Sequence, residues 1–130
     1  MSHVPKQLQY TKDHEWVRRD DDGTFVVGIT DHAQQQLGEL VYVELPEPGR
    51  TLKPGDALAV VESTKAASDV YAPIAGSVLG VNPALASEPE HVNTDPYGAG
   101  WLVRLQPAAA GALPELLDAA AYAALLDAAH

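Results

Sequence analysis

Short runs of apolar and β-branched residues, separated by turns that contain Gly or Pro, fill the chain as far as residue 106. We predict strands over residues 15–19, 24–29, 40–44, 57–62, 68–71, 76–81 and 101–105. Turn signals between them include Asp-Asp-Gly at 21–23, Pro-Glu-Pro-Gly at 46–49 and Lys-Pro-Gly-Asp at 53–56. Many short strands with evenly spaced turns are typical of a sandwich or a small barrel. We therefore expect a mainly β fold.

Two segments have a helical pattern instead. Residues 30–38 begin with the capping residue Thr30, continue with Asp31 in the first turn and end at Gly38, which predicts a short helix. The tail over 113–128 is rich in Ala and Leu and has Pro114 near its start. Its apolar residues recur at helical spacing: they are Leu113, Leu116, Leu117, Ala120, Ala121, Ala124 and Leu125. We expect this tail to form a surface helix packed on the barrel.

The length of 130 residues suits one domain. We expect that domain to cover residues 1–130, with a terminal extension over 1–7 and with a loose connector, starting at 106 or 107, before the tail helix. The first residues lack the apolar stretch of a signal peptide, and no apolar run approaches the roughly 20 residues of a membrane span. The expected location is therefore the cytoplasm.

Charge and cysteine content narrow the possible partners. The net charge is −10, which argues against nucleic acid and anionic membranes as partners and favours basic surfaces on other proteins. The chain has no cysteine and one methionine. An ordinary protein of a reducing compartment would look like this. So would a protein whose thiol chemistry is carried by a cofactor, and the count alone does not separate the two.

Lys65 has the most informative position in the chain. It sits on a short polar tip between the predicted strands 57–62 and 68–71, and such tips are exposed to solvent. A catalytic lysine needs burial or a neighbouring cation to lower a pKa of about 10.4, whereas Glu62 and Asp69 would raise it. The position therefore favours covalent attachment of a group over catalysis.

Other candidate chemistry is weaker. His14, His32 and His91 follow no zinc-ligand spacing, so we expect capping and surface roles and no metal site. Ser63 and Ser68 have no histidine near them in sequence that would serve as a base, so we expect no catalytic site. The glycine pair at 98–100 is not followed by a helical pattern, which argues against a phosphate-binding loop.

Residues 61–76, Val-Glu-Ser-Thr-Lys-Ala-Ala-Ser-Asp-Val-Tyr-Ala-Pro-Ile-Ala-Gly, closely resemble the lipoyl-lysine signature of glycine cleavage system H proteins. Further blocks resemble the same family in the same order, at 10–17, 28–34, 37–46 and 93–102, and together they span about residues 7–105. In one departure, Thr64 stands where that family is expected to have valine. Both residues are β-branched and the turn is exposed, so we expect little effect.

This resemblance implies a barrel-sandwich hybrid of the lipoyl/biotinyl type, with a short helix after the third strand and a C-terminal surface helix. It implies (R)-lipoic acid in amide linkage on Lys65, and a carrier rather than an enzyme. The implied partners are glycine decarboxylase (P protein), aminomethyltransferase (T protein), dihydrolipoyl dehydrogenase (L protein) and a lipoate ligase or lipoyl/octanoyl transferase. The arm would accept the aminomethyl group from glycine decarboxylation and deliver it to the tetrahydrofolate-dependent aminomethyltransferase, where methylene passes to tetrahydrofolate and ammonia is freed. Dihydrolipoyl dehydrogenase would then reoxidise the arm. The location would be the bacterial cytoplasm, or the mitochondrial matrix for a mature eukaryotic chain.

The resemblance also implies roles for residues around the lysine. Recognition of the tip would involve Glu62, Ser63, Thr64, Ala66 and Asp69. In this family the loaded arm can fold back into a cleft of its own carrier. By resemblance Glu15, with Asp13 as a further candidate, would face the ammonium group of the arm there, because a carboxylate holds a cationic amine well.

Several alternatives stay open at this stage. A biotinyl domain would resemble Met-Lys-Met at the tip, and Thr64 and Ala66 argue against it. A lipoyl domain of a 2-oxoacid dehydrogenase shares the tip but lacks the blocks around Trp16 and Trp101. The remaining alternatives are a relay that passes lipoyl groups to other proteins, an unmodified interaction module and a small enzyme. The mass of the intact protein separates modified from unmodified readings.

Overall fold

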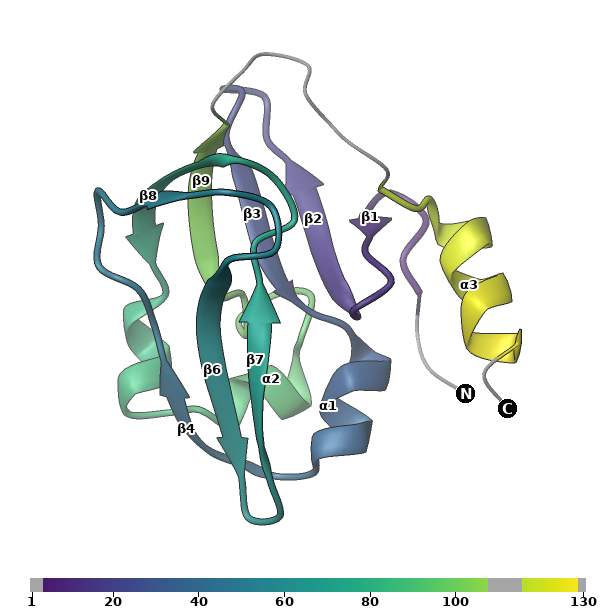
Figure 1. Ribbon diagram of the computed structural model, residues 1–130. Coiled ribbons are helices and arrows are strands. Elements are labelled where there is room, and N and C mark those ends of the chain that lie inside the picture. The colour runs from purple at the N-terminus through teal and green to yellow at the C-terminus, as the bar shows by residue number, and fades with distance from the viewer. Residues whose placement is uncertain (1–3, 108–115, 129–130) are drawn as a thin grey trace.

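The computed structural model describes residues 4–107 and 116–128, which form two antiparallel sheets with helices around them (Figure 1). The larger sheet has the order β1-β2-β3-β9-β8-β5 and the smaller one the order β4-β6-β7. Within the described residues the strands are β1 (Gln9–Tyr10), β2 (Glu15–Arg19), β3 (Phe25–Ile29), β4 (Leu40–Glu44), β5 (Thr51–Leu52), β6 (Ala57–Ser63), β7 (Ala67–Tyr71), β8 (Gly76–Val81) and β9 (Val103–Pro107). The expected mainly β fold is confirmed.

The main core lies between the two sheets and takes residues from both. In β3 every residue is buried, and since side chains alternate along a strand, Phe25, Val27 and Ile29 enter this core. Val26 points the other way, into a second cluster with Trp16 and Tyr122. The larger sheet is therefore covered on both faces in this region.

The short helix α1 (Asp31–Leu37) follows β3, as predicted. The Thr30 hydroxyl accepts a hydrogen bond from the Ala33 N–H, which satisfies one of the free donors of the first turn. The helix ends at Gly38, whose φ of 86° and ψ of −162° are open to glycine but not to other residues. The local sequence signals decide both ends of this helix.

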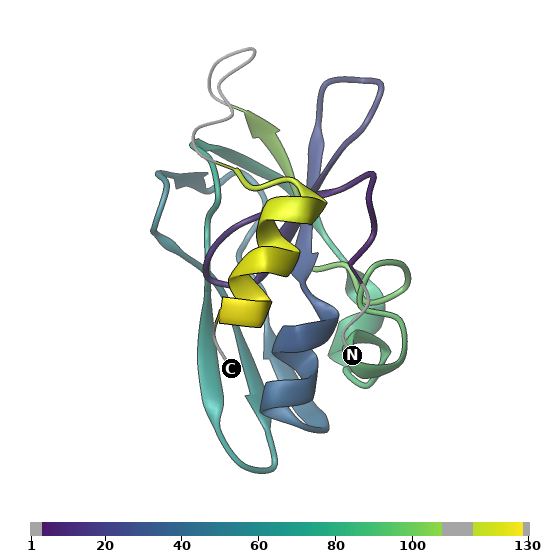
Figure 2. The same ribbon diagram turned by 90° about the vertical axis from the view of Figure 1, so that its right-hand side faces the viewer.

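The helix α3 (Ala119–Ala128) packs beside β1, at the edge of the larger sheet (Figures 1 and 2). The helix begins at Ala119, whereas the sequence pattern predicts a start at 113. Residues 113–115 of the predicted helix lie outside the described residues. Leu117 is extended because its backbone N–H and C=O pair with Tyr10, each at 2.7 Å. Asp118 then caps the helix through the Ala121 N–H at 2.8 Å. Because Leu117 pairs with Tyr10, which is distant in sequence, the helix begins only at Ala119.

The buried face of α3 also differs from the predicted one. Tyr122 and Leu126 are buried, four residues apart, while Ala120, Ala121 and Ala124 are exposed. The prediction holds for Leu116, Leu117 and Leu125, which are partly buried against the core clusters. It was wrong for the three alanines, because they carry too little apolar surface to compete with one tyrosine for the core.

Four short elements were not predicted, and one strand is shifted. The unpredicted ones are β1, β5, the 3₁₀ helix η1 (Pro83–Ala86) and α2 (His91–Thr94). The last strand covers 103–107 and not 101–105, so the residues at 106 and 107 belong to the sheet and not to a connector. The Trp101 carbonyl instead accepts a hydrogen bond from the Asn82 side chain at 2.9 Å. No helix in the described part of the chain is long and apolar enough to cross a membrane.

Candidate functional site

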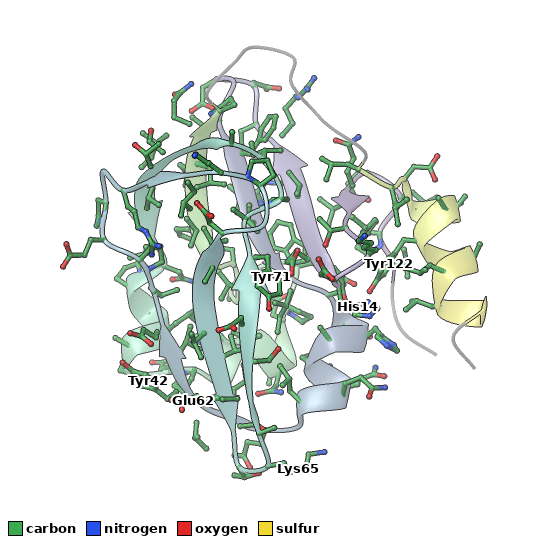
Figure 3. All side chains as sticks on the ribbon, in the orientation of Figure 1. His14, Tyr42, Glu62, Lys65, Tyr71 and Tyr122 are labelled. Atoms are coloured by element: carbon green, nitrogen blue, oxygen red, sulfur yellow. The ribbon has the colours of Figure 1, made fainter. Side chains whose placement is uncertain are left out.

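The hairpin of β6 and β7 carries Lys65 at its outer end (Figure 3). The strands pair in register with Val60 opposite Asp69, Val61 opposite Ser68 and Glu62 opposite Ala67. Val61 and Val70 are buried in the main core, so the hairpin is anchored on its inner face. The lysine side chain is exposed, as the sequence predicts for a residue on a tip.

Ser63 organises the turn that presents Lys65. Its hydroxyl oxygen accepts hydrogen bonds from the backbone N–H groups of Lys65 and Ala66, both at 3.1 Å. The Ser63 N–H donates to the Ala66 carbonyl at 2.8 Å, and the Thr64 N–H donates to the Glu39 carbonyl at 3.3 Å. Serine hydroxyls stabilise turns in this way. The turn is therefore tied both to itself and to the segment before β4.

The aliphatic part of Lys65 lies against Gly38, the residue that ends α1. A Cβ atom placed on Gly38 would lie 3.0 Å from Lys65 Cε and 3.5 Å from Nζ. No ion pair involves Lys65 within the described residues. The amine is thus exposed, free of a carboxylate partner, and close to the end of α1 (Figure 3).

The outer face of the smaller sheet surrounds the tip with acidic and apolar side chains. Glu62 is half-buried and lies opposite Tyr42 of β4, which is 52% exposed. Asp69 is exposed on the neighbouring strand. Of the residues predicted to recognise the tip, Thr64 and Ala66 are exposed and Ser63 is half-buried. The predicted set therefore lies on one hairpin, with Asp69 farther from the tip, opposite Val60.

Two cavities lie beside the hairpin and share Asp13 and Glu15 in their walls. The near cavity has a volume of about 150 Å³, between α1 and β7, and Ser68, Asp69 and Leu37 line it as well. The far cavity has a volume of about 440 Å³, and its walls include Thr11, Lys12, Tyr71, Pro73, Leu116 and Leu117. Leu37, in the wall of the near cavity, is followed in the chain by Gly38, against which the Lys65 side chain lies.

Glu15 is buried between the two cavities, 2% exposed. The alternation of β2 places it on the same face as Val17, which belongs to the main core. Its carboxylate accepts a hydrogen bond from the Thr11 hydroxyl at 2.7 Å and one from the Tyr71 N–H at 3.4 Å. No Lys, Arg or His among residues 4–107 and 116–128 forms an ion pair with it.

Burial raises the pKa of Glu15 to about 7, and the charge of Asp13 adds to this rise. The hydrogen bonds from Thr11 and Tyr71 lower the pKa but do not outweigh burial. A carboxylate that is buried without a cation is costly. Such a group, placed in the wall of a cavity, is suited to receive a cationic ligand. The predicted pair of Asp13 and Glu15 does line one site, with Asp13 exposed and Glu15 buried.

Among the described residues, no group of three or more His, Cys, Asp or Glu could hold a metal ion. His14 has a packing role, which differs from the capping or surface role that we expected. Its Nδ1 atom lies 2.8 Å from the Tyr122 hydroxyl, and its ring lies 4.7 Å from that of His32.

Several residues at the site were missed in the sequence. Thr11 and Tyr71 bind Glu15, while Leu116 and Leu117 form a wall of the far cavity. Tyr122 offered a signal, since it is the one aromatic side chain in the Ala- and Leu-rich tail over 108–130. An aromatic residue in such a segment marks the side that packs against the protein.

Comparison with known proteins gives consistent matches over nearly the whole chain. The family model described as "Glycine cleavage H-protein" matches residues 8–129. The "Glycine cleavage system H protein" of Halorhodospira halophila is 60% identical over 126 residues, which cover 97% of each chain. The protein of the same description from an Enterobacter species is 54% identical over 127 residues, 98% of each chain. The crystal structure of a glycine cleavage system H protein from Mycobacterium marinum is similar with a TM-score of 0.86 at 45% identity, covering 95% of this chain and 99% of that one.

Proposed function

Because the chain belongs to the glycine cleavage H-protein family, whose members are carriers and not catalysts, we propose that it bears (R)-lipoic acid in amide linkage on Lys65. The family implies a lipoyl carrier of the glycine cleavage system. The choice of Lys65 is supported by its exposed amine on a turn held by Ser63. That exposed position is the single observation on which the attachment site depends. We propose one carrier unit over the chain, working in the cytoplasm.

The residues at the tip fit the group that the family implies. A modifying enzyme must reach the Lys65 amine, and no ion pair within the described residues holds it. A rigid base allows each partner to find the tip in one geometry. When attached, the lipoyl group would supply a disulfide that a nucleophile can open with a thiolate as leaving group. Lys65 would carry this group between glycine decarboxylase, aminomethyltransferase and dihydrolipoyl dehydrogenase.

The two cavities together form what we call the arm cleft, which would shelter the loaded arm between partners. Glu15 would hold the ammonium group of the cargo, with Asp13 and Asp69 in the same walls. A buried carboxylate with no cation gains most from such a partner, since the charge-assisted hydrogen bond forms away from water. The enclosed position would also keep water from the hydrolysable group.

The acidic residues around the tip support recognition by basic surfaces. Glu62 and Asp69 flank Lys65 on adjacent strands, and amide formation removes the nearby positive charge. The exposed Thr64 and Ala66 complete the surface that a lipoate ligase or a lipoyl/octanoyl transferase would contact, and Ser63 fixes its shape. Such complementarity increases the rate of association more than the final affinity.

The attachment site is tested by the mass of the intact protein after co-expression with a lipoate ligase. The wild-type chain should gain one lipoyl group and Lys65→Arg should gain none. Lys53→Arg is the matched control, because Lys53 is also an exposed lysine in a turn, and it should be modified like wild type. A lipoyl group on Lys65→Arg would contradict the proposal, and a biotinyl mass would favour the biotinyl alternative.

The partner system is tested by reconstitution of the loaded chain with glycine decarboxylase. The carrier should support the release of carbon dioxide from glycine. A loaded chain that fails here but serves a 2-oxoacid dehydrogenase, or donates its lipoyl group to other proteins, would instead support one of those alternatives.

The arm cleft is tested by the lifetime of the aminomethyl group on the loaded carrier in Glu15→Gln. The amide cannot become negative, so the lifetime should shorten about tenfold, as expected for one lost charge-assisted hydrogen bond. Glu44→Gln, an exposed strand residue, should behave like wild type. An unchanged lifetime in Glu15→Gln would remove this role.

A further inference from the structure

Asp13, His14 and Glu15 belong to one tight turn that leads into β2. The Thr11 hydroxyl oxygen accepts hydrogen bonds from the N–H groups of Asp13 and Glu15, at 3.2 and 3.1 Å, and the Glu15 carbonyl accepts one from the Thr11 N–H at 2.9 Å. Among the described residues His14 is the one non-glycine residue with positive φ, 70°. Such a backbone persists where surrounding contacts hold it in place.

The contact comes from the other end of the chain. The Tyr122 hydroxyl lies 2.8 Å from His14 Nδ1 and 2.8 Å from the Thr30 hydroxyl. The Thr30 N–H donates to the His14 carbonyl at 3.0 Å, so the ring and the backbone of His14 are both fixed. Figure 3 shows His14 and Tyr122 side by side, between the larger sheet and α3.

Tyr122 is itself rigid. It is fully buried and its ring stacks on Tyr10 with centroids 4.7 Å apart and planes 8° from parallel. Burial raises the pKa of Tyr122 to about 12, although the hydrogen bond with Thr30 opposes this and the charges of Tyr97 and Glu15 add to it. The hydroxyl therefore keeps its proton near neutral pH. Burial and His32 lower the pKa of His14, although Asp13 opposes this. A neutral imidazole has one ring nitrogen that accepts a hydrogen bond, so in the tautomer with Nδ1 unprotonated the Tyr122 hydroxyl can donate to it.

We propose that Tyr122 is a positioning residue for the arm cleft, whose hydroxyl holds the His14 turn so that the Glu15 carboxylate stays between the two cavities. The inference rests on the proposed role of Glu15 toward the arm. Its neighbours in the same C-terminal segment, Leu116 and Leu117, line the far cavity. The C-terminal segment thus supplies one wall of the cleft and also fixes its carboxylate.

The test compares two hydroxyl deletions in the same aromatic stack. Tyr122→Phe keeps the ring on Tyr10 but removes the bonds to His14 and Thr30. Tyr10→Phe is the matched control, because it keeps the same stack and removes a buried hydrogen bond to the Pro5 carbonyl, at 2.5 Å, that does not touch the His14 turn. Both variants should lose thermal stability, so a loss of stability alone does not distinguish them.

Two readouts do distinguish them. In the full chain labelled with ¹³C-glutamate, the Glu15 carboxyl, assigned with Glu15→Gln, should titrate near pH 7 in wild type and in Tyr10→Phe. In Tyr122→Phe it should shift toward the ordinary value, because a loosened turn admits water. On the loaded carrier, Tyr122→Phe should shorten the lifetime of the aminomethyl group about fivefold, the ratio that corresponds to one net hydrogen bond.

The outcomes separate the two hypotheses. If Tyr122→Phe keeps the wild-type titration of Glu15, or if Tyr10→Phe changes it as much, Tyr122 does not position Glu15. If Glu15→Gln leaves the lifetime unchanged, the arm-cleft function fails. The titration of the unloaded chain still decides the role of Tyr122 in that case.

Discussion

At the scale of single residues, Glu15 combines two features that ordinarily exclude each other: it is 2% exposed, and no residue in the described part of the chain pairs with it as a cation. Folding tolerates this cost because the group can hold a proton. The sequence indicated a carboxylate at this position, but its burial depends on β7 and on the Thr11 turn, which lie beside it only in the folded chain.

This burial predicts how stability depends on pH. The pKa of Glu15 is about 7 in the folded protein against 4.5 ordinarily, so the folded state binds more protons than the unfolded state between these values. The free energy of unfolding should therefore fall as pH rises from 4.5 to 7, by up to about 3 kcal/mol from this group. Glu15→Gln should lack this fall and be more stable than wild type at pH 8.

Urea unfolding of the unloaded chain at a series of pH values measures this, with Glu44→Gln as the control that should follow wild type. Parallel curves for wild type and Glu15→Gln would show that the carboxyl does not titrate in this range.

At the scale of elements, α1 and the β6–β7 hairpin meet where Gly38 touches Lys65. The sequence predicted α1 correctly because its ends depend on Thr30 and Gly38, which are local signals. It placed the start of the C-terminal helix wrongly because Leu117 pairs with Tyr10, over a hundred residues away. The capping residues of α1 could therefore be recognised in the sequence. The long-range pairing of Leu117 with Tyr10, which competes with helix formation, could not.

The contact at Gly38 can be tested with Gly38→Ala. The backbone there is in a region that other residues avoid, so the variant should lose about 1–3 kcal/mol of stability. The new Cβ would also lie 3.0 Å from Lys65 Cε, so this side chain must shift by a few tenths of an ångström, and we expect lipoylation to slow. Gly23→Ala is the control, with φ of 85° and no atom within 4 Å of a new Cβ.

Thermal melting and the rate of lipoylation measure the two effects. The control should lose stability but be lipoylated at the wild-type rate. Equal lipoylation rates in Gly38→Ala and Gly23→Ala would show that the contact with Gly38 does not matter for modification.

At the scale of the whole molecule, the net charge of −10 makes association with basic partners depend on where the negative charges lie. The hairpin that carries Lys65 also carries Glu62 near the tip and Asp69 farther along β7. The turn between β2 and β3 and the loop after β4 carry Asp21 and Glu47, both exposed and away from the tip. Total charge and local charge can therefore be varied separately.

We expect the double variant Glu62→Lys/Asp69→Lys to be lipoylated about tenfold more slowly at low salt, with a weaker dependence on salt. Asp21→Lys/Glu47→Lys changes the net charge equally and should stay within about twofold of wild type, because these charges lie on other loops and salt screens the interactions of distant exposed charges. The rate of lipoylation at several ionic strengths measures this. Similar losses in both variants would show that only the total charge counts.

The sequence by itself determined the mainly β class, α1, the family and an exposed Lys65, because strand alternation, caps and turns are local and the family motif is continuous. The roles of the residues around Lys65 stay predictions. Only the tertiary structure placed Glu15 between two cavities and joined Tyr122 to His14. Burial and hydrogen bonding across a hundred residues depend on how strands and helices pack, which no local pattern encodes.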